Sequence, residues 1–270
     1  MRVVFTFLLV IISNCSFGQF HTAMSKSELG IMVGGSFYIG DLNPIMPFRN
    51  THLAGGILYR YNIHSRLSVR ANLTYGKVSG DDALATEEIM RQRNLNFSST
   101  IYELGAGVEF NYFPFQLGHD RYKGTAYILA EIAVFQMNPK SRYEGGEVEL
   151  QPLGTEGQGT SLNSKKHYGL TQLSIPIGVG AKLSLGKRVG VNFEIGIRKT
   201  FTDYMDDVGS NEYVDPVVLA QENGPLSAAL SNRSGSMYGN RGNSSTKDWY
   251  VFSGMMLTIQ LGKPGNCYSH

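Results

Sequence analysis

Nine charged side chains recur within apolar stretches of this chain, where charge is uncommon. Two glutamates held close together away from water could act as a general acid and a general base. Nothing in the sequence places a nucleophile beside them, and the near balance of acids and bases favours mutual ion pairing. We therefore interpret the set as a structural charge network, made of Glu28, Arg60, Arg70, Glu103, Glu109, Glu131, Lys182, Glu194 and Arg198.

Four aspartates that lie close together in the sequence form a second candidate, because carboxylate oxygens are the ligands that Ca²⁺ prefers. A solvated or helix-capping role is the preferred interpretation of this group (Asp203, Asp206, Asp207 and Asp215). The six histidines are scattered without the spacing of zinc ligands, and no Ser–His–Asp arrangement can be argued. The sequence therefore predicts no cofactor, no metal ion, no small-molecule substrate and no enzymatic activity.

The overall composition excludes several classes of protein. Glycine accounts for 32 of 270 residues, with 15 Tyr and 14 Phe, while only 17% of the residues are charged and the net charge is +2. The low charge argues against intrinsic disorder, and the near-neutral balance gives no electrostatic footprint for nucleic acid. Two cysteines cannot build a disulfide framework. Asn14 disfavours lipid attachment at Cys15, which leaves Cys267 as a lone thiol.

The N-terminus has the layout of an export signal. Arg2 precedes an apolar run over Val3–Ile12, and Ser16-Phe17-Gly18 places small residues before a cleavage point. Residues 1–18 are therefore expected to be a signal peptide, and residues 19–270 a single domain that leaves the cytoplasm. No later segment reaches the roughly 18 apolar residues of a transmembrane helix.

Beyond this segment, apolar and polar residues alternate with a period of two. In Val189–Phe201, valine, isoleucine and phenylalanine take every second position, with Lys199 as the exception. Such alternation is typical of a strand with one apolar and one polar face. We predict eight strands of this kind, over Leu29–Ile39, Leu53–Tyr61, Leu67–Tyr75, Thr100–Tyr112, Ala126–Val134, Leu173–Leu183, Val189–Phe201 and Trp249–Leu261.

The connections between these strands alternate in length. Short or moderate turns (Asn62–Arg66, Phe113–Gly124, Ser184–Arg188) follow the even strands, and long loops follow the odd ones, with a short helix expected over Asp81–Arg93. This asymmetry is typical of outer-membrane barrels. The sequence predicts an all-β fold, an eight-stranded antiparallel up-and-down transmembrane β-barrel with long extracellular loops. Such a barrel would lie in the outer membrane with both termini periplasmic.

The glycines decide which face of the strands points outward, because they share the face that carries the charges. A soluble ligand-binding barrel, the alternative, has the opposite sense. A solvated outer surface gives no reason for so many strand glycines, whereas the lumen of an eight-stranded barrel is barely wide enough for side chains and leaves no channel. Aromatic residues of the apolar face also cluster at two levels, as membrane girdles do. One level holds Phe37, Tyr75, Tyr102, Phe201 and Trp249, and the other holds Tyr59, Tyr61, Phe110 and Tyr112.

Several loop motifs are too specific for a generic barrel. They are Gly40-Asp41-Leu42, Arg93-Asn94-Leu95 with Phe97, Thr155-Glu156-Gly157-Gln158-Gly159, Thr202-Asp203-Tyr204 with Asp206, Asp207, Tyr213 and Asp215, Asn240-Arg241-Gly242, and Asp248-Trp249-Tyr250. Together these motifs resemble the PorG family of outer-membrane barrels from the type IX secretion system. The resemblance covers nearly the whole mature chain.

This resemblance implies a non-enzymatic component of protein secretion that contacts outer-membrane lipid. Members of the PorG family associate with a periplasmic ring built from the PorK lipoprotein and PorN, and link that ring to the outer membrane. The ring would face the termini and short turns, where basic residues are frequent (Arg66, Arg121, Lys123, Lys187, Arg188 and Lys263). The loop motifs would form a hydrogen-bonded cap over the barrel mouth. A general structural or adhesion-type barrel without a secretion role is the alternative.

Overall fold

Eight long strands dominate the computed structural model, which describes residues 27–44, 46–237 and 240–262. They are β1 (Ser27–Ile39), β2 (His52–His64), β3 (Leu67–Asp81), β4 (Asn96–Asn111), β5 (Gly124–Gln136), β8 (Thr171–Ser184), β9 (Val189–Thr200) and β10 (Trp249–Leu261). Each strand overlaps one alternating segment predicted from the sequence. The expected signal peptide at residues 1–18, Cys15 and Cys267 lie outside the described residues.

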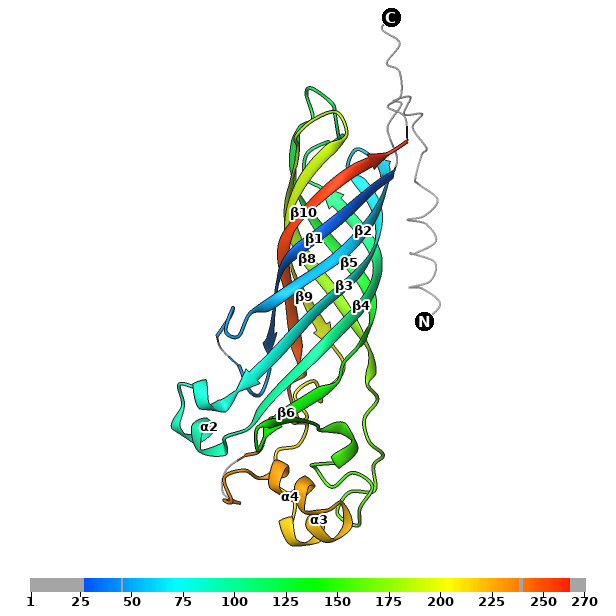
Figure 1. Cartoon of the computed structure of the whole chain (residues 1–270). Coiled ribbons are helices and arrows are strands. Elements are labelled where there is room, and N and C mark those ends of the chain that lie inside the picture. The colour runs from blue at the N-terminus through cyan, green and yellow to red at the C-terminus, as the bar shows by residue number, and fades with distance from the viewer. Residues whose placement is uncertain (1–26, 45, 238–239, 263–270) are drawn as a thin grey trace, which may run out of the picture.

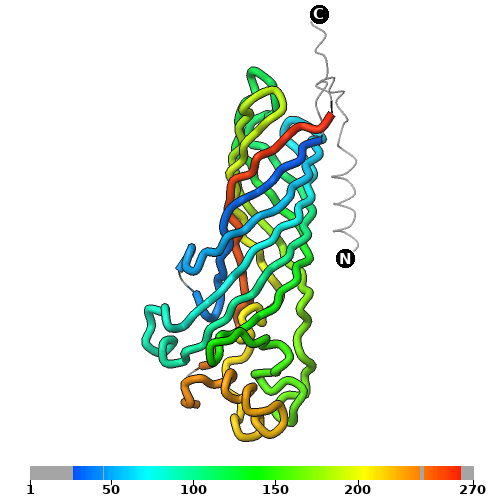
Figure 2. The backbone as a smooth tube through the Cα atoms, in the orientation of Figure 1, coloured from blue at the N-terminus to red at the C-terminus, as the bar shows by residue number. Residues whose placement is uncertain are grey.

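These strands close into an antiparallel up-and-down barrel (Figures 1 and 2). Neighbours in sequence pair around the wall, and β1 pairs with β10 from Ser27↔Leu261 to Ile39↔Trp249. Closure leaves the barrel itself without an unpaired edge. The prediction of an eight-stranded antiparallel barrel is therefore confirmed. The first strand begins and the last strand ends at the same end of the barrel, opposite the long loops (Figure 1).

The outer face of the wall is apolar, because the two-residue period of a strand sends alternate side chains to opposite sides. Leu53 is 78% exposed, Ile132 is 71% exposed and Leu104 is 63% exposed. Inward positions carry the charged residues and many of the glycines. At Gly34, for example, a Cβ would overlap backbone atoms of Ser253 and Gly254 on the neighbouring strand. The narrow barrel thus needs glycine where two strands approach closely.

The long connections contain regular elements that the sequence analysis did not predict. A hairpin of β6 (Pro139–Tyr143) and β7 (Gly146–Glu149) lies between β5 and β8, and β6 pairs with β4. Two helices, α3 (Pro216–Glu222) and α4 (Pro225–Ser231), lie between β9 and β10. The helix expected between β3 and β4 is present as a 3-10 turn followed by α2 (Glu88–Arg93). In the described part of the chain, every helix is too short or too polar to cross a membrane.

The aromatic girdle differs from its prediction at one position. Phe37 is buried, because Phe48 from the following loop covers it with 5.0 Å between the ring centroids. Phe37 keeps its predicted place on the apolar face, but Phe48 covers it there. Tyr75 and Tyr102 lie side by side on the outer face, 5.3 Å apart, and about half of each side chain is exposed.

Candidate functional site: a filled lumen and a closed loop cap

Glu109 of β4 lies at the centre of the lumen, where three basic side chains converge on it. Arg60 Nη2 lies 2.9 Å from the Glu109 carboxylate and Arg70 Nη1 lies 3.3 Å from it, while Lys182 Nζ donates to its other oxygen. All four side chains are buried, so the charges compensate one another away from water. Arg60 and Arg70 extend the network to three further carboxylates at 2.6–2.8 Å, those of Glu28, Glu131 and Glu194.

A separate ion pair lies nearer the long loops. Arg198 Nη2 is 3.2 Å from Glu103 Oε1, and the hydroxyl of Tyr250 donates to Glu103 Oε2 at 2.6 Å. The Arg198 guanidinium also lies over the ring of Phe252, 4.8 Å from its centroid. The structure thus places all nine charged residues proposed for the lumen inside it, as one network of seven and one pair of two.

The lumen is filled at its short-turn end by apolar residues from the turn between β4 and β5. Phe115 and Leu117 are buried there, and Lys182 Nζ lies 4.9 Å from the centroid of the Phe115 ring. These side chains cover the charge network on its short-turn side. The basic side chains of the network are themselves buried beneath this layer.

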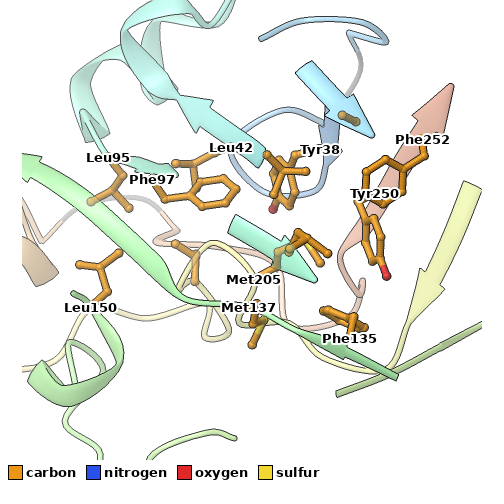
Figure 3. Close-up of a cluster of buried hydrophobic side chains, with 14 of the residues drawn as sticks. Tyr38, Leu42, Leu95, Phe97, Phe135, Met137, Leu150, Met205, Tyr250 and Phe252 are labelled. Atoms are coloured by element: carbon orange, nitrogen blue, oxygen red, sulfur yellow. The ribbon is translucent and has the colours of Figure 1, made fainter. Parts of the chain in front are cut away.

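An apolar cluster fills the opposite end of the lumen (Figure 3). Figure 3 shows Tyr38, Phe97, Phe135 and Tyr250 from the strands pointing toward one another, with Met205 from the last loop inserted among them. Tyr38 and Phe97 pack edge to face at 4.8 Å, and Phe135 and Tyr250 lie 5.1 Å apart. This end of the barrel therefore contains a packed apolar core, which strand and loop residues build together.

The four long loops close over this end of the barrel as a loop cap, and Arg93 joins three of them. Its guanidinium forms a two-pronged pair with Asp82, with Nε and Nη2 both 2.7 Å from carboxylate oxygens. Its remaining hydrogen bonds go to the backbone carbonyls of Asp41, at 2.9 Å, and Arg241, at 2.5 Å. Paired N–H groups in a planar fork give both strength and a fixed orientation. Arg93 thus connects the first, second and fourth long loops.

Arg241 joins the third long loop to the fourth. Its Nη1 lies 2.5 Å from Glu156 Oε1 and 3.0 Å from the carbonyl oxygen of Asp207. Glu156 Oε1 also accepts the backbone N–H groups of Gly209 and Ser210, both at 2.9 Å. The Arg241 and Glu156 side chains are each 2% exposed, so this ion pair is fully desolvated. Breaking it by removing one partner would leave the other charge buried and unpaired.

The hydroxyl of Tyr38 lies 2.6 Å from two carboxylate oxygens, Asp206 Oδ2 and Asp248 Oδ1. A hydroxyl has one proton to donate, so one of the two carboxyl groups must carry a proton and donate it to the tyrosine oxygen. Burial and the neighbouring carboxylate raise the pKa of Asp206 well above its usual range, and burial raises the pKa of Asp248 to about 8. The two ends of the last long loop are therefore held together through a shared proton.

The remaining aspartates of the predicted acidic group have separate partners. Asp207 is buried and accepts hydrogen bonds from the hydroxyls of Thr155 and, at 2.7 Å, Tyr168. Burial raises the pKa of Asp207 to about 6, although the charge of Arg241 opposes this shift. Asp203 pairs with a lysine at 3.2 Å, and Asp215 caps α3. Among the described residues, no three His, Cys, Asp or Glu side chains are arranged to hold a metal ion.

The other motif residues divide between packing roles and the loop surface. Leu42, Leu95 and Phe97 belong to the apolar cluster. Gly157 and Gly159 have positive φ angles of 73° and 79°, which glycine adopts without strain. A further group lies close around the network: Gly40, Gln158, Thr202, Tyr204, Gly242 and Tyr250. Asn94 is an exposed cap of α2, and Trp249 lies against Lys199 on the outer face. Tyr213 is only half-buried, and Asn240 and Asp215 are exposed, so these three do not join the buried network.

Three residues of the network were missed in the sequence analysis. Asp82 lies inside the segment expected to be a helix, and the pair of consecutive aspartates there was the signal that could have indicated a buried ion pair. Tyr38 occupies an inward position of β1, where a large polar ring among glycines is unusual. Tyr168 contacts a carboxylate 39 residues away, so no local pattern could have identified it.

Known structures with some similarity to the chain are small β-barrels. Neisserial surface protein A is 8% identical, with a TM-score of 0.44, over 87% of this chain and 97% of that chain. Ail, the attachment invasion locus protein of Yersinia pestis, is 10% identical, with a TM-score of 0.39, over 87% and 97% of the two chains. The N-terminal barrel of OprF from Pseudomonas aeruginosa is 11% identical, with a TM-score of 0.36, over 87% and 98%.

Sequence comparison identifies the family. No curated protein matches the chain significantly. A family model described as a domain of unknown function, DUF6089, matches residues 2–219, which is most of the chain, and the protein therefore belongs to the DUF6089 family.

Proposed function

We propose that this protein is a non-enzymatic outer-membrane component of the type IX protein secretion system. In this role it links a periplasmic ring of PorK- and PorN-like proteins to the outer membrane. The observation that carries the proposal is the buried contact network among the motif residues on which the PorG resemblance depends, above all Arg93, Glu156, Asp207 and Arg241. A barrel scaffold does not need this network, so a resemblance at these residues extends beyond the scaffold.

The barrel wall and lumen support an anchoring role. The outer face exposes an aliphatic band, which is the surface that a strand-built membrane protein presents to lipid. The lumen is filled by ion pairs and by two apolar layers, which suits an anchor better than a channel. We further propose that the long loops face outward and that both termini lie in the periplasm.

The short-turn end is the surface we assign to the ring. Its turns expose five basic side chains and one acidic side chain, Asp120, in the described part of the chain; the bases are Arg66, Arg121, Lys123, Lys187 and Arg188. Exposed apolar side chains lie among them, including Phe113 (56%) and Leu185 (64%). This combination fits a partner with an acidic rim and an apolar centre. Residues 19–26 and the tail with Lys263 and Cys267, also assigned to this surface, lie outside the described residues.

Co-purification tests the proposal. The tagged full chain would be isolated in mild detergent after cross-linking in cells, and the proteins that follow it would be identified. We expect PorK- and PorN-like components with the natural sequence, and their loss when Arg121, Lys187 and Arg188 are each changed to Glu. The control is Arg142→Glu, which alters an exposed base at the opposite end. Absence of ring components, from a barrel whose gel mobility still shifts on boiling, would exclude this role.

A general structural or adhesion-type barrel is the second candidate. Exposed apolar side chains on the loop elements favour it, namely Leu84 (52%), Ile89 (60%) and Val217 (63%). Under this alternative, deletion of the gene would leave protein secretion intact and would reduce attachment of cells to surfaces. The non-enzymatic assignment has its own test, because a lipid-modifying enzyme would change the lipid A profile of the deletion strain and an anchor would not.

A further inference from the structure

The outer face of the wall continues beyond the aromatic residues as a polar sheet surface. β3 and β4 stay paired past Tyr75↔Tyr102, first at Lys77↔Thr100 and then at Ser79↔Ser98. β6 adds to the other edge of β4, with Lys140 opposite Ser98. Because paired residues share a face, Lys77 and Lys140 point to the same outer side as the tyrosines. The apolar wall thus turns directly into a charged surface, on which three bases are paired with three acids: Lys77 with Glu147, Lys140 with Glu149 and Arg142 with Asp81.

The height of these lysines above the tyrosines follows from strand geometry. A strand rises about 3.3 Å per residue and barrel strands tilt by roughly 45°, so two residues add about 5 Å of height. Lys77 therefore lies about 5 Å beyond Tyr75, and Lys140 about 9 Å beyond Tyr102. The polar zone of a bilayer leaflet is about 5–8 Å deep, so Lys77 falls at the level of the lipid headgroups and Lys140 at their outer edge.

Two adjoining hollows occupy this surface. Their volumes are about 340 Å³ and about 260 Å³, and Lys77, Ser98, Lys140 and Glu147 line both of them. The smaller hollow extends to Tyr102 at the edge of the apolar wall, and the larger one extends toward the loops, to Arg142 and His52. A ligand in this groove would meet cationic groups on the loop side and an aromatic side chain on the side of the apolar wall.

The cations of the groove are held by weak ion pairs. Lys77 Nζ lies 3.6 Å from Glu147, and Lys140 Nζ lies 3.3 Å from Glu149, with both glutamate side chains 51% exposed. Exposed pairs of this kind contribute about 0–1 kcal/mol. A phosphate group, with more charge and more acceptor oxygens than one carboxylate, can replace these glutamates at little cost. His52 donates or accepts at Ser79 and lines the upper hollow.

We propose that this groove binds the phosphorylated headgroup of an outer-leaflet lipid, with Lys77 and Lys140 as the phosphate ligands. The acyl chains would lie along the exposed apolar wall below Tyr75 and Tyr102. A lipid satisfies both parts of the surface at once, whereas an acidic protein segment would leave the adjoining apolar wall unmatched. The inference rests on the membrane location and orientation in the proposed function, and it is independent of the secretion role.

Binding of bisphosphorylated lipid A to the purified full chain in detergent micelles tests the inference. Native mass spectrometry would follow the titration for the natural sequence and for the double variant Lys77→Gln/Lys140→Gln. Each lysine near a charged lipid contributes about 1 kcal/mol, so the double variant should bind about 30-fold more weakly. Glu147→Gln should bind more tightly than the natural sequence, because it frees Lys77. Dephosphorylated lipid A should bind equally to all forms.

Lys199→Gln is the matched control, since Lys199 is an exposed lysine of the outer wall at the same end of the barrel but on β9. It should leave lipid A binding unchanged. Equal binding by the double variant, or an equal loss in the control, would overturn the inference. Inorganic phosphate that competes at the affinity of lipid A would also overturn it, by showing a phosphate site. Cell fractionation beforehand tests the membrane location separately, so the two failures are distinguishable.

Discussion

Replacing Asp248 by asparagine should keep the loop cap closed and weaken its sensitivity to pH. Asparagine resembles the protonated carboxyl group: its amide can donate to the Tyr38 oxygen, and its carbonyl can accept the Met205 N–H that Asp248 accepts at 2.9 Å. Tyr38 would then donate to Asp206 without a shared proton. In the natural protein, full ionisation would instead place two carboxylates against one hydroxyl in a buried position.

The direction of the pH effect follows from the raised pKa. The closed cap keeps Asp248 protonated up to a pKa of about 8, whereas an opened cap releases the proton near the ordinary value of 3.8. Closing therefore takes up a proton, so the closed cap is most stable in acid and loses stability as the pH rises from 3.8 towards about 8. One proton corresponds to about 1.4 kcal/mol per pH unit. Between pH 6 and pH 8 the open population should rise about 50-fold, because the group is half-titrated at a pH equal to its pKa.

Other charged groups of the loop cap also act on the pKa values of Asp206 and Asp248. Asp203 and Asp41 add negative charge near Asp248, and Asp41 adds negative charge near Asp206. The positive groups of the cap that bear on these carboxylates are Arg93, which interacts with Asp206, and Lys247, which pairs with Asp203.

Hydrogen–deuterium exchange over residues 202–210 measures the opening. After correction for intrinsic exchange rates, protection in the natural protein should fall about tenfold from pH 6 to 7 and about fivefold from pH 7 to 8, and the fall should be smaller in Asp248→Asn. Asp203→Asn is the control, because the pKa of Asp203 is raised only to about 6 and its contribution ends near that pH. Protection that is independent of pH in the natural protein, or the same slope in Asp248→Asn, would refute the shared proton.

Three further substitutions probe the loop cap, the lumen and the pairing of β1 with β10. Arg241→Met should destabilise the closed cap by about 3–5 kcal/mol, because it leaves Glu156 buried without a cation. Proteolysis of the loops should therefore increase, while the barrel itself stays folded and its gel mobility still shifts on boiling. Arg60→Met should lower the free energy of barrel unfolding in urea by a similar amount, about 3–5 kcal/mol, and adding Glu28→Gln should recover part of it. Gly34→Ala should impair barrel folding on gels, because its Cβ overlaps the facing backbone, whereas Gly55→Ala, whose Cβ meets its nearest atom at 3.3 Å, should fold normally.

The barrel could be predicted from the sequence because its apolar outer wall makes most alternate residues of the eight strands apolar. The same rule explains where the predicted strands stop. Above Tyr75 the outward residues become polar, as at Lys77, and the inward ones become apolar, as at Val78 and Phe97. The contrast between the two faces inverts there, so a search for an apolar outer face ends several residues before β3 does.

The loop elements were missed although they had sequence signals. Asp215-Pro216 places a capping residue and a proline at the first turn of α3, which is a common helix start. Between β6 and β7, Glu144 and Gly145 both have positive φ angles, of 49° and 84°, as a two-residue hairpin turn requires. The strands it joins are short, and nearly half of their residues are charged, so they lack the apolar alternation by which the barrel strands were identified.

Pairing inside the lumen lay beyond the sequence. The face of each strand assigns a charged residue to the lumen, but its partner depends on strand tilt and stagger around the closed barrel. Arg70, for example, binds Glu194, which is 124 residues away on β9. The junction of Arg241 with Glu156 spans 85 residues and depends on how two loops fold over the mouth. The resemblance identified these motif residues without indicating which of them meet.

Secretion by a deletion strain that carries defined variants tests the central proposal most directly. The measurement is the amount of type IX cargo in the culture medium, relative to cells with the natural gene, at equal levels of heat-shifted barrel. Our account predicts that deletion stops secretion and that reversing the charges of Arg121, Lys187 and Arg188 does so too, while Arg142→Glu at the loop end restores it fully. Undiminished secretion without the protein would contradict the account.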